Sequence, residues 1–226
     1  MTINLTDPHH DQPILRAGAP LAEADGAIIL LHGRGGTAKD ILSLGRVLSG
    51  QRLAHLAPQA AENSWYPHSF LSRRQENEPY LTSALNTVQA LVQFAEQAGI
   101  PAERIVIAGF SQGACLATEF VVSYPRRYAA LVAFTGGLVG PLGTDLTHVG
   151  DLAGTPALLA CGDPDPHIPW ERVEQSAEIL RSMGAEVTTR RYPGRPHTIS
   201  PEEIELGEKL VQSAFASMGP VVRPSI

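Results

Sequence analysis

The pentapeptide Gly109-Phe110-Ser111-Gln112-Gly113 contains a serine that could serve as a nucleophile. An apolar, β-branched run at residues 105–108 leads into it, and an apolar helical stretch at 114–124 follows. A strand, a sharp turn and a helix in this order lift the serine hydroxyl clear of the sheet. Glycine at the two outer positions removes side chains that would collide where strand and helix cross. The sequence therefore favours a nucleophile elbow over an ordinary serine in a glycine-bounded turn.

A serine hydroxyl needs a base that takes its proton and an acid that orients the base. When the nucleophile lies on such an elbow, the chain order is serine, acid, histidine. His197 follows the last predicted strand, residues 186–192, and Asp163 and Asp165 follow the strand before it, residues 156–161. Position alone leaves both aspartates open as the acid, and either could simply cap its turn. Four other histidines are expected to be ordinary side chains: His55, His68, His148 and His167.

The loop at residues 32–36 could complete the chemistry. A tetrahedral intermediate needs backbone N–H donors at its oxyanion, one from the residue after the nucleophile and one from a loop after an early strand. These donors are expected to be Gln112 and Arg34, since the glycines around Arg34 let the backbone approach the reacting carbon. A phosphate-binding loop is disfavoured, because the three glycines of this loop fit neither a dinucleotide-binding nor a Walker pattern.

Alternating strand and helix patterns must position these groups. Strands are predicted at 27–31, 53–56, 104–108, 129–134, 156–161 and 186–192, and helices at 37–48, 81–98, 114–124, 171–183 and 201–216. This alternation predicts an α/β fold with a mostly parallel central sheet and helices on both faces. Two long connections, 58–79 and 136–155, leave from the sheet edge where ligands bind. We expect a single domain over 1–226, with loose termini at 1–13 and 219–226 and no large lid.

Composition excludes several classes of function. The chain has 226 residues, 43% of them hydrophobic and 18% charged, as in ordinary globular domains. A net charge of −6 without a basic stripe argues against nucleic acid as a partner. Residues 1–12 carry no secretory signal and no apolar run could span a bilayer, so a cytoplasmic protein is expected. Cys115 and Cys161 are expected to be buried free thiols, and no metal or other cofactor is needed.

Several segments jointly resemble the small carboxylesterases, lysophospholipases and acyl-protein thioesterases of the α/β-hydrolase fold. They lie between residues 27 and 216: Leu31-His32-Gly33, residues 63–67, the elbow, Thr135-Gly136-Gly137-Leu138, Asp165-Pro166-His167-Ile168-Pro169 and residues 192–197. The resemblance selects Asp165 as the acid, because it begins a segment similar to the Asp-x-x-Val-Pro motif of the family. The chain departs from acyl-protein thioesterases at residues 34–36, at Pro67 and at Pro196. These departures put the substrate in doubt and leave the triad untouched.

The resemblance implies a serine carboxylesterase that acts on small to medium esters through an acyl-enzyme, with Ser111, Asp165 and His197 as catalytic residues. Lysophospholipase or acyl-protein thioesterase activity is the alternative, and a non-catalytic binding module is a weaker one. The substrate pocket is expected to draw on four residues: Trp65, Tyr66, Leu138 and Ile168.

Two further expectations concern Arg34 and the partners of the chain. The Arg34 side chain could lie at the pocket mouth and favour anionic acyl or head groups. Alternatively, it could form a structural salt bridge or lie in solvent. The expected partner is a small-molecule ester, without integral membrane association, and an apolar surface helix could support a homodimer.

Overall fold

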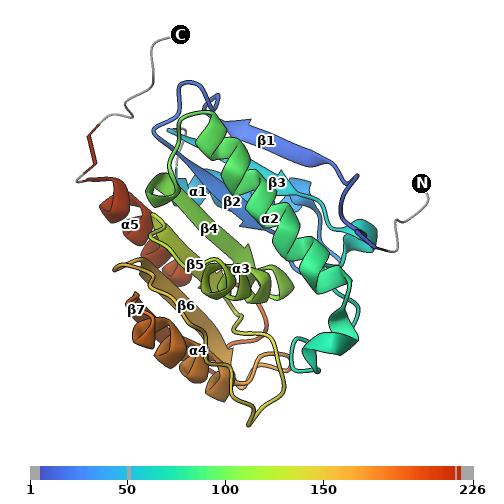
Figure 1. The fold of residues 1–226 in the computed structure, drawn as a ribbon. Coiled ribbons are helices and arrows are strands. Elements are labelled where there is room, and N and C mark those ends of the chain that lie inside the picture. Colours follow the sequence, from blue (N-terminus) through green and yellow to red (C-terminus); the bar gives the residue numbers. More distant parts are fainter. Residues whose placement is uncertain (1–5, 50–51, 217, 220–226) are drawn as a thin grey trace.

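The structure, a computed structural model, describes residues 6–49, 52–216 and 218–219 (Figure 1). In this part of the chain, seven strands form one sheet in the order β1-β3-β2-β4-β5-β6-β7. The strands are β1 (Ile14–Gly18), β2 (Gly26–Leu31), β3 (Leu53–Pro58), β4 (Ile105–Phe110), β5 (Ala130–Phe134), β6 (Pro156–Asp163) and β7 (Glu186–Pro193). Strand β1 is antiparallel to β3, and all other neighbouring pairs are parallel. The predicted mostly parallel sheet is confirmed.

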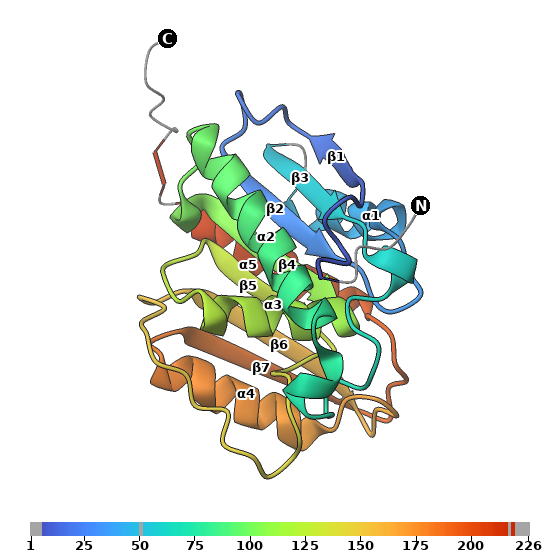
Figure 2. The same cartoon turned by 45° about the vertical axis from the view of Figure 1, so that its right-hand side comes forward.

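In the described part of the chain, five α-helices cover both faces of this sheet (Figures 1 and 2). They are α1 (Ala38–Ser49), α2 (Tyr80–Gln97), α3 (Gln112–Ser123), α4 (Trp170–Ser182) and α5 (Pro201–Ala216). Helices α2, α3 and α4 pack on one face, and α1 and α5 pack together on the other. Strand β2 is buried along its whole length because both of its faces are covered. Among the described helices, none is long and apolar enough to cross a membrane.

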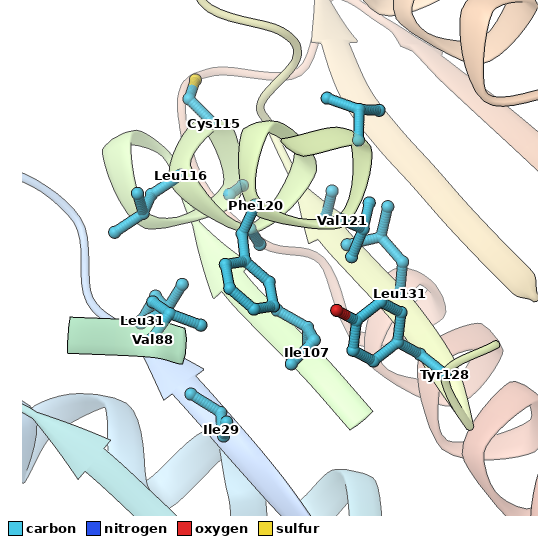
Figure 3. Close-up of a cluster of buried hydrophobic side chains, with 14 of the residues drawn as sticks. Ile29, Leu31, Val88, Ile107, Cys115, Leu116, Phe120, Val121, Tyr128 and Leu131 are labelled. Carbon is cyan, nitrogen blue, oxygen red and sulfur yellow. The ribbon is translucent and has the colours of Figure 1, made fainter. Parts of the chain in front are cut away.

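Helix α3, which follows the elbow, lies at the centre of the larger core. Nearly all of its residues are buried, from Gln112 to Val122. Figure 3 shows Phe120 directed from this helix onto Ile107 of β4, with Leu131 of β5 and Val88 of α2 close by. Close packing on every side leaves the helix little freedom to move. The first residues of α3 are therefore fixed relative to the sheet edge that carries Ser111.

The two surface helices α1 and α5 both begin at a capping box. The Thr37 N–H donates to Asp40 Oδ2 over 3.1 Å, and the Asp40 N–H donates to Thr37 Oγ1 over 3.2 Å. At α5, the Ser200 N–H donates to Glu203 Oε2 over 2.7 Å, and the Glu203 N–H donates to Ser200 Oγ over 3.3 Å. Reciprocal bonds of this kind satisfy N–H groups that a helix start leaves free.

The N-terminal region corrects one prediction. Residues 6–13 are not loose, because His9 is buried and is bonded to the backbone of Ala61 and Trp65. Strand β1 was also absent from the predicted elements. Its sequence, Ile-Leu-Arg-Ala-Gly, has no clear alternation, and the strand exists through its pairing with β3. Residues 1–5 and 220–226 of the predicted loose termini lie outside the described residues.

Candidate active site

Ser111 occupies a strained turn between β4 and α3. Its φ of 55° and ψ of −120° lie outside the favoured regions for a residue with a side chain. The backbone N–H of Ser111 donates to Phe134 O of the neighbouring strand over 2.9 Å, which holds the turn against the sheet. A Cβ on Gly109 would lie 2.4 Å from Gly113 C, and one on Gly113 would lie 2.0 Å from Leu31 O. Both glycines are therefore sterically required, as the elbow predicts.

A continuous hydrogen-bonded chain leads from Ser111 to a buried carboxylate. His197 Nε2 lies 2.8 Å from Ser111 Oγ, and His197 Nδ1 lies 2.8 Å from Asp165 Oδ2. Asp165 Oδ1 accepts the backbone N–H groups of His167 (2.8 Å) and Ile168 (2.9 Å). Burial acts to raise the pKa of Asp165, but these N–H donors and His197 outweigh it, so the pKa lies below its usual value. The carboxylate is therefore charged and oriented toward the imidazole.

The structure brings Asp165, and not Asp163, to His197. Asp163 Oδ2 instead accepts a hydrogen bond from Arg191 Nε over 2.8 Å, within an ion pair between neighbouring strands. Of the other histidines, His167 has its ring edge-on to the His197 ring, with 4.9 Å between centroids. His55 is buried on β3, and His148 bonds to the backbone of its own loop.

Among the described residues, the backbone N–H groups of Arg34 and Gln112 have no acceptor, and both residues border the same hollow as Ser111. The next two N–H groups of the same loop are occupied: Gly35 donates to Asn63 O over 2.7 Å and Gly36 to Gly33 O over 3.0 Å. A Cβ on Gly33 would lie 3.4 Å from Ser111 Cβ, so the glycine allows the loop to approach the nucleophile closely. The free donors are the two that the sequence predicts for an oxyanion hole.

The side chains of these two donor residues bind one short segment, residues 64–68. Gln112 Oε1 accepts the Trp65 N–H over 2.9 Å, and Gln112 Nε2 donates to Tyr66 O over 2.8 Å. The Arg34 guanidinium donates to three successive carbonyls, those of Tyr66 (2.9 Å), Pro67 (2.8 Å) and His68 (2.7 Å). The guanidinium is thus committed to the backbone. The sequence left three other arrangements open for the Arg34 side chain: a salt bridge, exposure to solvent, and a place at the pocket mouth where it would bind anions. The observed hydrogen bonds to backbone carbonyls differ from all three.

A cavity of about 390 Å³ opens beside Ser111, His197 and Gln112. Its remaining walls come mainly from the 66–70 segment, helix α3 and the loop after β6: Arg34, Tyr66, Pro67, His68, Ser69, Phe70, Cys115, His167 and Ile168. Tyr66 and Ile168 were predicted to line it. Cys115 was not, although it lies one helical turn after Ser111 and therefore on the same face of α3.

Trp65 and Leu138 correct the predicted pocket, because neither lines this cavity. Both are fully buried in the core. Trp65 Nε1 donates to His32 O over 2.8 Å, and the Leu138 carbonyl accepts from Arg172 over 2.8 Å. Trp65 and Leu138 therefore pack into the core and support the loops that carry the site.

Comparison with known proteins places the chain in a family. A model of the phospholipase/carboxylesterase family matches residues 17–213, most of the chain. The chain belongs to the phospholipase/carboxylesterase family. A solved phospholipase/carboxylesterase from Dyadobacter fermentans is 48% identical to it, with a TM-score of 0.86, covering 89% of this chain and 97% of the other. The Bacillus cereus carboxylesterase, at 20% identity and a TM-score of 0.72, shares the fold and covers 91% of this chain and 96% of its own.

Curated relatives of this phospholipase/carboxylesterase family member include acyl-protein thioesterases. Acyl-protein thioesterase 1 of Gibberella zeae is 32% identical over 117 residues, which are 51% of this chain and 50% of that protein. Acyl-protein thioesterase 1 homolog 1 of Dictyostelium discoideum is 32% identical over 155 residues, 67% of this chain and 68% of that protein. The match to the Gibberella protein therefore spans half of its length.

The thiols of this family member are poor candidates for chemistry. Cys115 and Cys161 are free and buried, as predicted. Burial raises the pKa of each to about 12. The reactive form of cysteine is the thiolate, which is scarce at neutral pH when the pKa is this high. The raised pKa therefore makes the Cys115 thiol a poor candidate for the nucleophile at this cavity.

Two buried histidines support the loops that carry the site. His9 Nε2 donates to Trp65 O over 3.0 Å, and its Nδ1 accepts the Ala61 N–H over 3.0 Å. His32 Nδ1 donates to Gly33 O over 2.8 Å, and its Nε2 accepts the Ala60 N–H over 3.1 Å. Each ring accepts through one nitrogen, so each is neutral. Burial lowers the pKa of both below 6.5.

These histidines predict that the fold loses stability in mild acid. Below pH 6.5 the unfolded chain binds protons that the folded chain excludes. The contribution to stability is complete above pH 6.5 and is lost as the pH falls toward the folded pKa, by at most about 1.4 kcal/mol per pH unit for each histidine. Urea unfolding across pH 5–7.5 measures the slope, which we expect to be smaller in His9→Gln. The matched control, His10→Gln at an exposed imidazole, should keep the wild-type slope. An unchanged slope in His9→Gln would refute the assignment.

Proposed function

We propose that this chain is a carboxylic ester hydrolase that forms an acyl-enzyme on Ser111. The observation that carries the proposal is the hydrogen-bonded chain from Ser111 Oγ to His197 to Asp165, with 2.8 Å at each contact, beside two free backbone N–H groups. A serine, a base, an orienting acid and an oxyanion hole are the complete set that acyl transfer requires. Membership of the phospholipase/carboxylesterase family supports the same chemistry.

The catalytic cycle follows from the positions of the atoms. His197 Nε2 takes the Ser111 proton as Oγ attacks the ester carbonyl, and the N–H groups of Arg34 and Gln112 stabilise the oxyanion. The imidazolium, held by the charged Asp165, then protonates the alcohol oxygen as the carbonyl carbon–oxygen bond breaks. In the second half, His197 activates water, which releases the acid and restores the Ser111 hydroxyl.

The cavity favours small to medium acyl groups. A volume of about 390 Å³ is at the low end of the range for ligand sites. Its walls include several polar side chains, among them His68, Ser69 and His167, together with the apolar Phe70 and Ile168. A long alkyl chain would exceed a cavity of this volume. We therefore assign small, neutral carboxylic esters as the substrate class, and the buried free thiols favour a reducing, cytoplasmic setting.

The test combines an ester series with covalent labelling. With p-nitrophenyl esters from acetate to palmitate, we expect kcat/KM to peak at short acyl chains. A fluorophosphonate should add one phosphonyl group, located by peptide mass spectrometry on Ser111, and abolish hydrolysis. Label on another residue, or hydrolysis that survives complete labelling, would contradict the proposed nucleophile. A peak at palmitate would contradict the assigned substrate size.

Thioester hydrolysis is a second candidate, favoured by the names of the relatives from Gibberella zeae and Dictyostelium discoideum. The same triad serves both reactions, since an acyl-enzyme forms in either case. Matched oxygen and sulfur esters with one acyl group distinguish them. A large preference for the sulfur ester, beyond the ratio of the rates at which hydroxide hydrolyses the two esters, would favour the thioesterase. The same comparison with lysophospholipids tests the phospholipase activity in the family name.

A further inference from the structure

A second, apolar hollow begins on the other side of Ser111 and has no part in the cycle described above. Its volume is about 440 Å³. Its apolar lining comes from α1, the end of β4 and the start of α5: Ile41, Leu44, Val47, Phe110, Ile199 and Ile204. We call it the α1–α5 groove. Val47 at its rim is one of the most exposed large apolar side chains among the described residues, at 47%.

The groove and the catalytic cavity lie on opposite faces of the sheet. The apolar walls of the cavity, including Tyr66, Phe70 and Cys115, belong to the core under α2, α3 and α4. The groove residues Ile41 and Leu44 belong to the core under α1 and α5. Ser111 and His197 stand at the sheet edge between the two. A substrate bound at Ser111 can therefore extend in two directions.

The groove lies next to the elbow that carries the nucleophile. Gly33 lines the groove, and a Cβ on Gly33 would lie 3.4 Å from Ser111 Cβ and 3.3 Å from Phe110 Cδ1. Gly33 therefore packs against the elbow that carries Ser111, and Ser111 itself lines the cavity. Arg34, whose N–H faces the oxyanion, borders both hollows. Arg34 is thus the residue that the groove shares with the cavity where the bond is cleaved.

We infer that the α1–α5 groove binds the alcohol part of the ester, as a neutral apolar chain or ring. This inference rests on the proposed esterase function. The alcohol oxygen must take its proton from His197 Nε2 when the carbonyl carbon–oxygen bond breaks. His197 approaches Ser111 on the segment that continues through Ile199 into α5, and its ring lies 5.2 Å from the Phe110 ring of the groove. His197 itself lines the cavity, and its contact with Phe110 places the ring that protonates the alcohol oxygen next to the groove.

The two hollows also match what happens to the two parts of the ester during the reaction. The acyl group stays bonded to Ser111 after the alcohol leaves, and the cavity lined by Ser111 and Gln112 contains it throughout. The groove is shallow and open at Val47, which suits a group that must diffuse away. Asp40 is the one carboxylate of its lining. It disfavours an anionic head group, and the six apolar side chains of the lining favour an uncharged alkyl chain or ring.

Isomeric esters test the inference, because they differ only in which side of the carbonyl is long. Hexyl acetate and methyl heptanoate have the same atoms, so general hydrophobicity cancels. A fully buried methylene raises binding roughly fourfold, and we expect about twofold for each one in this open groove. From methyl to hexyl acetate, kcat/KM should therefore rise about thirtyfold. Release of acid, followed in a pH-stat, measures it.

Variants at exposed positions then locate the effect. Val47→Glu places a charge at the groove rim, and glutamate is a good helix former, so α1 should be preserved. The ratio of kcat/KM for hexyl acetate to kcat/KM for methyl acetate should fall at least about fivefold. The methyl heptanoate-to-methyl acetate ratio should not change. Ser43→Glu, at another exposed groove position of α1, provides an independent second variant. Leu142→Glu is the matched control: it is 43% exposed, outside both hollows, and should leave both ratios unchanged.

Each result has one meaning. A flat alcohol series in the wild type, or a loss in Val47→Glu confined to methyl heptanoate, would overturn the groove assignment while the esterase stands. A loss of the alcohol preference in Leu142→Glu of equal size would also overturn it. Absence of hydrolysis for every ester, with no fluorophosphonate label on Ser111, would remove the proposed function itself.

Discussion

Asp165→Asn should lower kcat on the order of 10⁴-fold and leave the fold intact. Three donors converge on this carboxylate, from His197 Nδ1 and the backbone N–H groups of His167 and Ile168. Asparagine offers one oxygen and one NH₂ group. Because the backbone donors are fixed, the amide oxygen turns to them and its NH₂ faces His197. The imidazole must then accept at Nδ1 and carry its proton on Nε2, where it can no longer take the proton of Ser111.

Asp163→Asn is the matched control two residues away. Asp163 pairs with Arg191 on the neighbouring strand, and that partly exposed pair is worth about 1 kcal/mol or less. We expect kcat within about twofold of the wild type, since an exposed ion pair adds little to stability. Steady-state kinetics on p-nitrophenyl acetate and far-ultraviolet circular dichroism of both variants provide the measurement. Equal losses in the two variants, or a loss confined to Asp163→Asn, would reassign the acid.

Steric and positional rules that act over a few residues made much of this site predictable. The glycines at 109 and 113 are required because two Cβ positions are forbidden, and that requirement can be recognised in the sequence. The order of serine, acid and histidine after successive strands is equally local in origin. Position left Asp163 and Asp165 open, and only the partner of each side chain distinguishes them: Arg191 for one and His197 for the other. Cys115 could have been predicted from its helical spacing to Ser111.

Contacts between distant parts of the chain decided what the sequence did not predict. Trp65 faces the core because His32 accepts its indole N–H, and because His9, far away in the chain, bonds to its carbonyl. Nothing near Trp65 in the sequence distinguishes that orientation from one into the cavity. Strand β1 likewise depends on β3, more than 30 residues later, rather than on a pattern of its own. The partners of the Arg34 guanidinium lie equally far along the chain.

Arg34→Met should lower kcat about tenfold to a hundredfold with little change in KM, for neutral and anionic esters alike. Losing one oxyanion donor outright costs on the order of 10²–10³ in turnover, and a displaced donor costs part of that. The guanidinium ties Arg34, the proposed source of one oxyanion N–H, to three carbonyls of segment 64–68, and the Gln112 side chain ties the other proposed donor residue to the same segment. Methionine keeps the length of the side chain and removes all of these donors. The loop can then move away from Ser111.

The distribution of the loss between substrates separates this positioning role from direct substrate binding. If Arg34 bound anionic acyl groups, Arg34→Met would raise KM for a hemisuccinate ester and spare the corresponding neutral ester. If Arg34 instead positions the oxyanion hole, Arg34→Met lowers kcat by the same factor for the hemisuccinate ester and the neutral ester. Arg34→Lys should recover only part of it, because a single ammonium cannot donate to three successive carbonyls in the geometry of the guanidinium. Full recovery of kcat in Arg34→Lys, or a loss confined to the hemisuccinate ester, would contradict the positioning role. Either result would show that the positive charge of residue 34 matters and that its three hydrogen bonds to segment 64–68 do not.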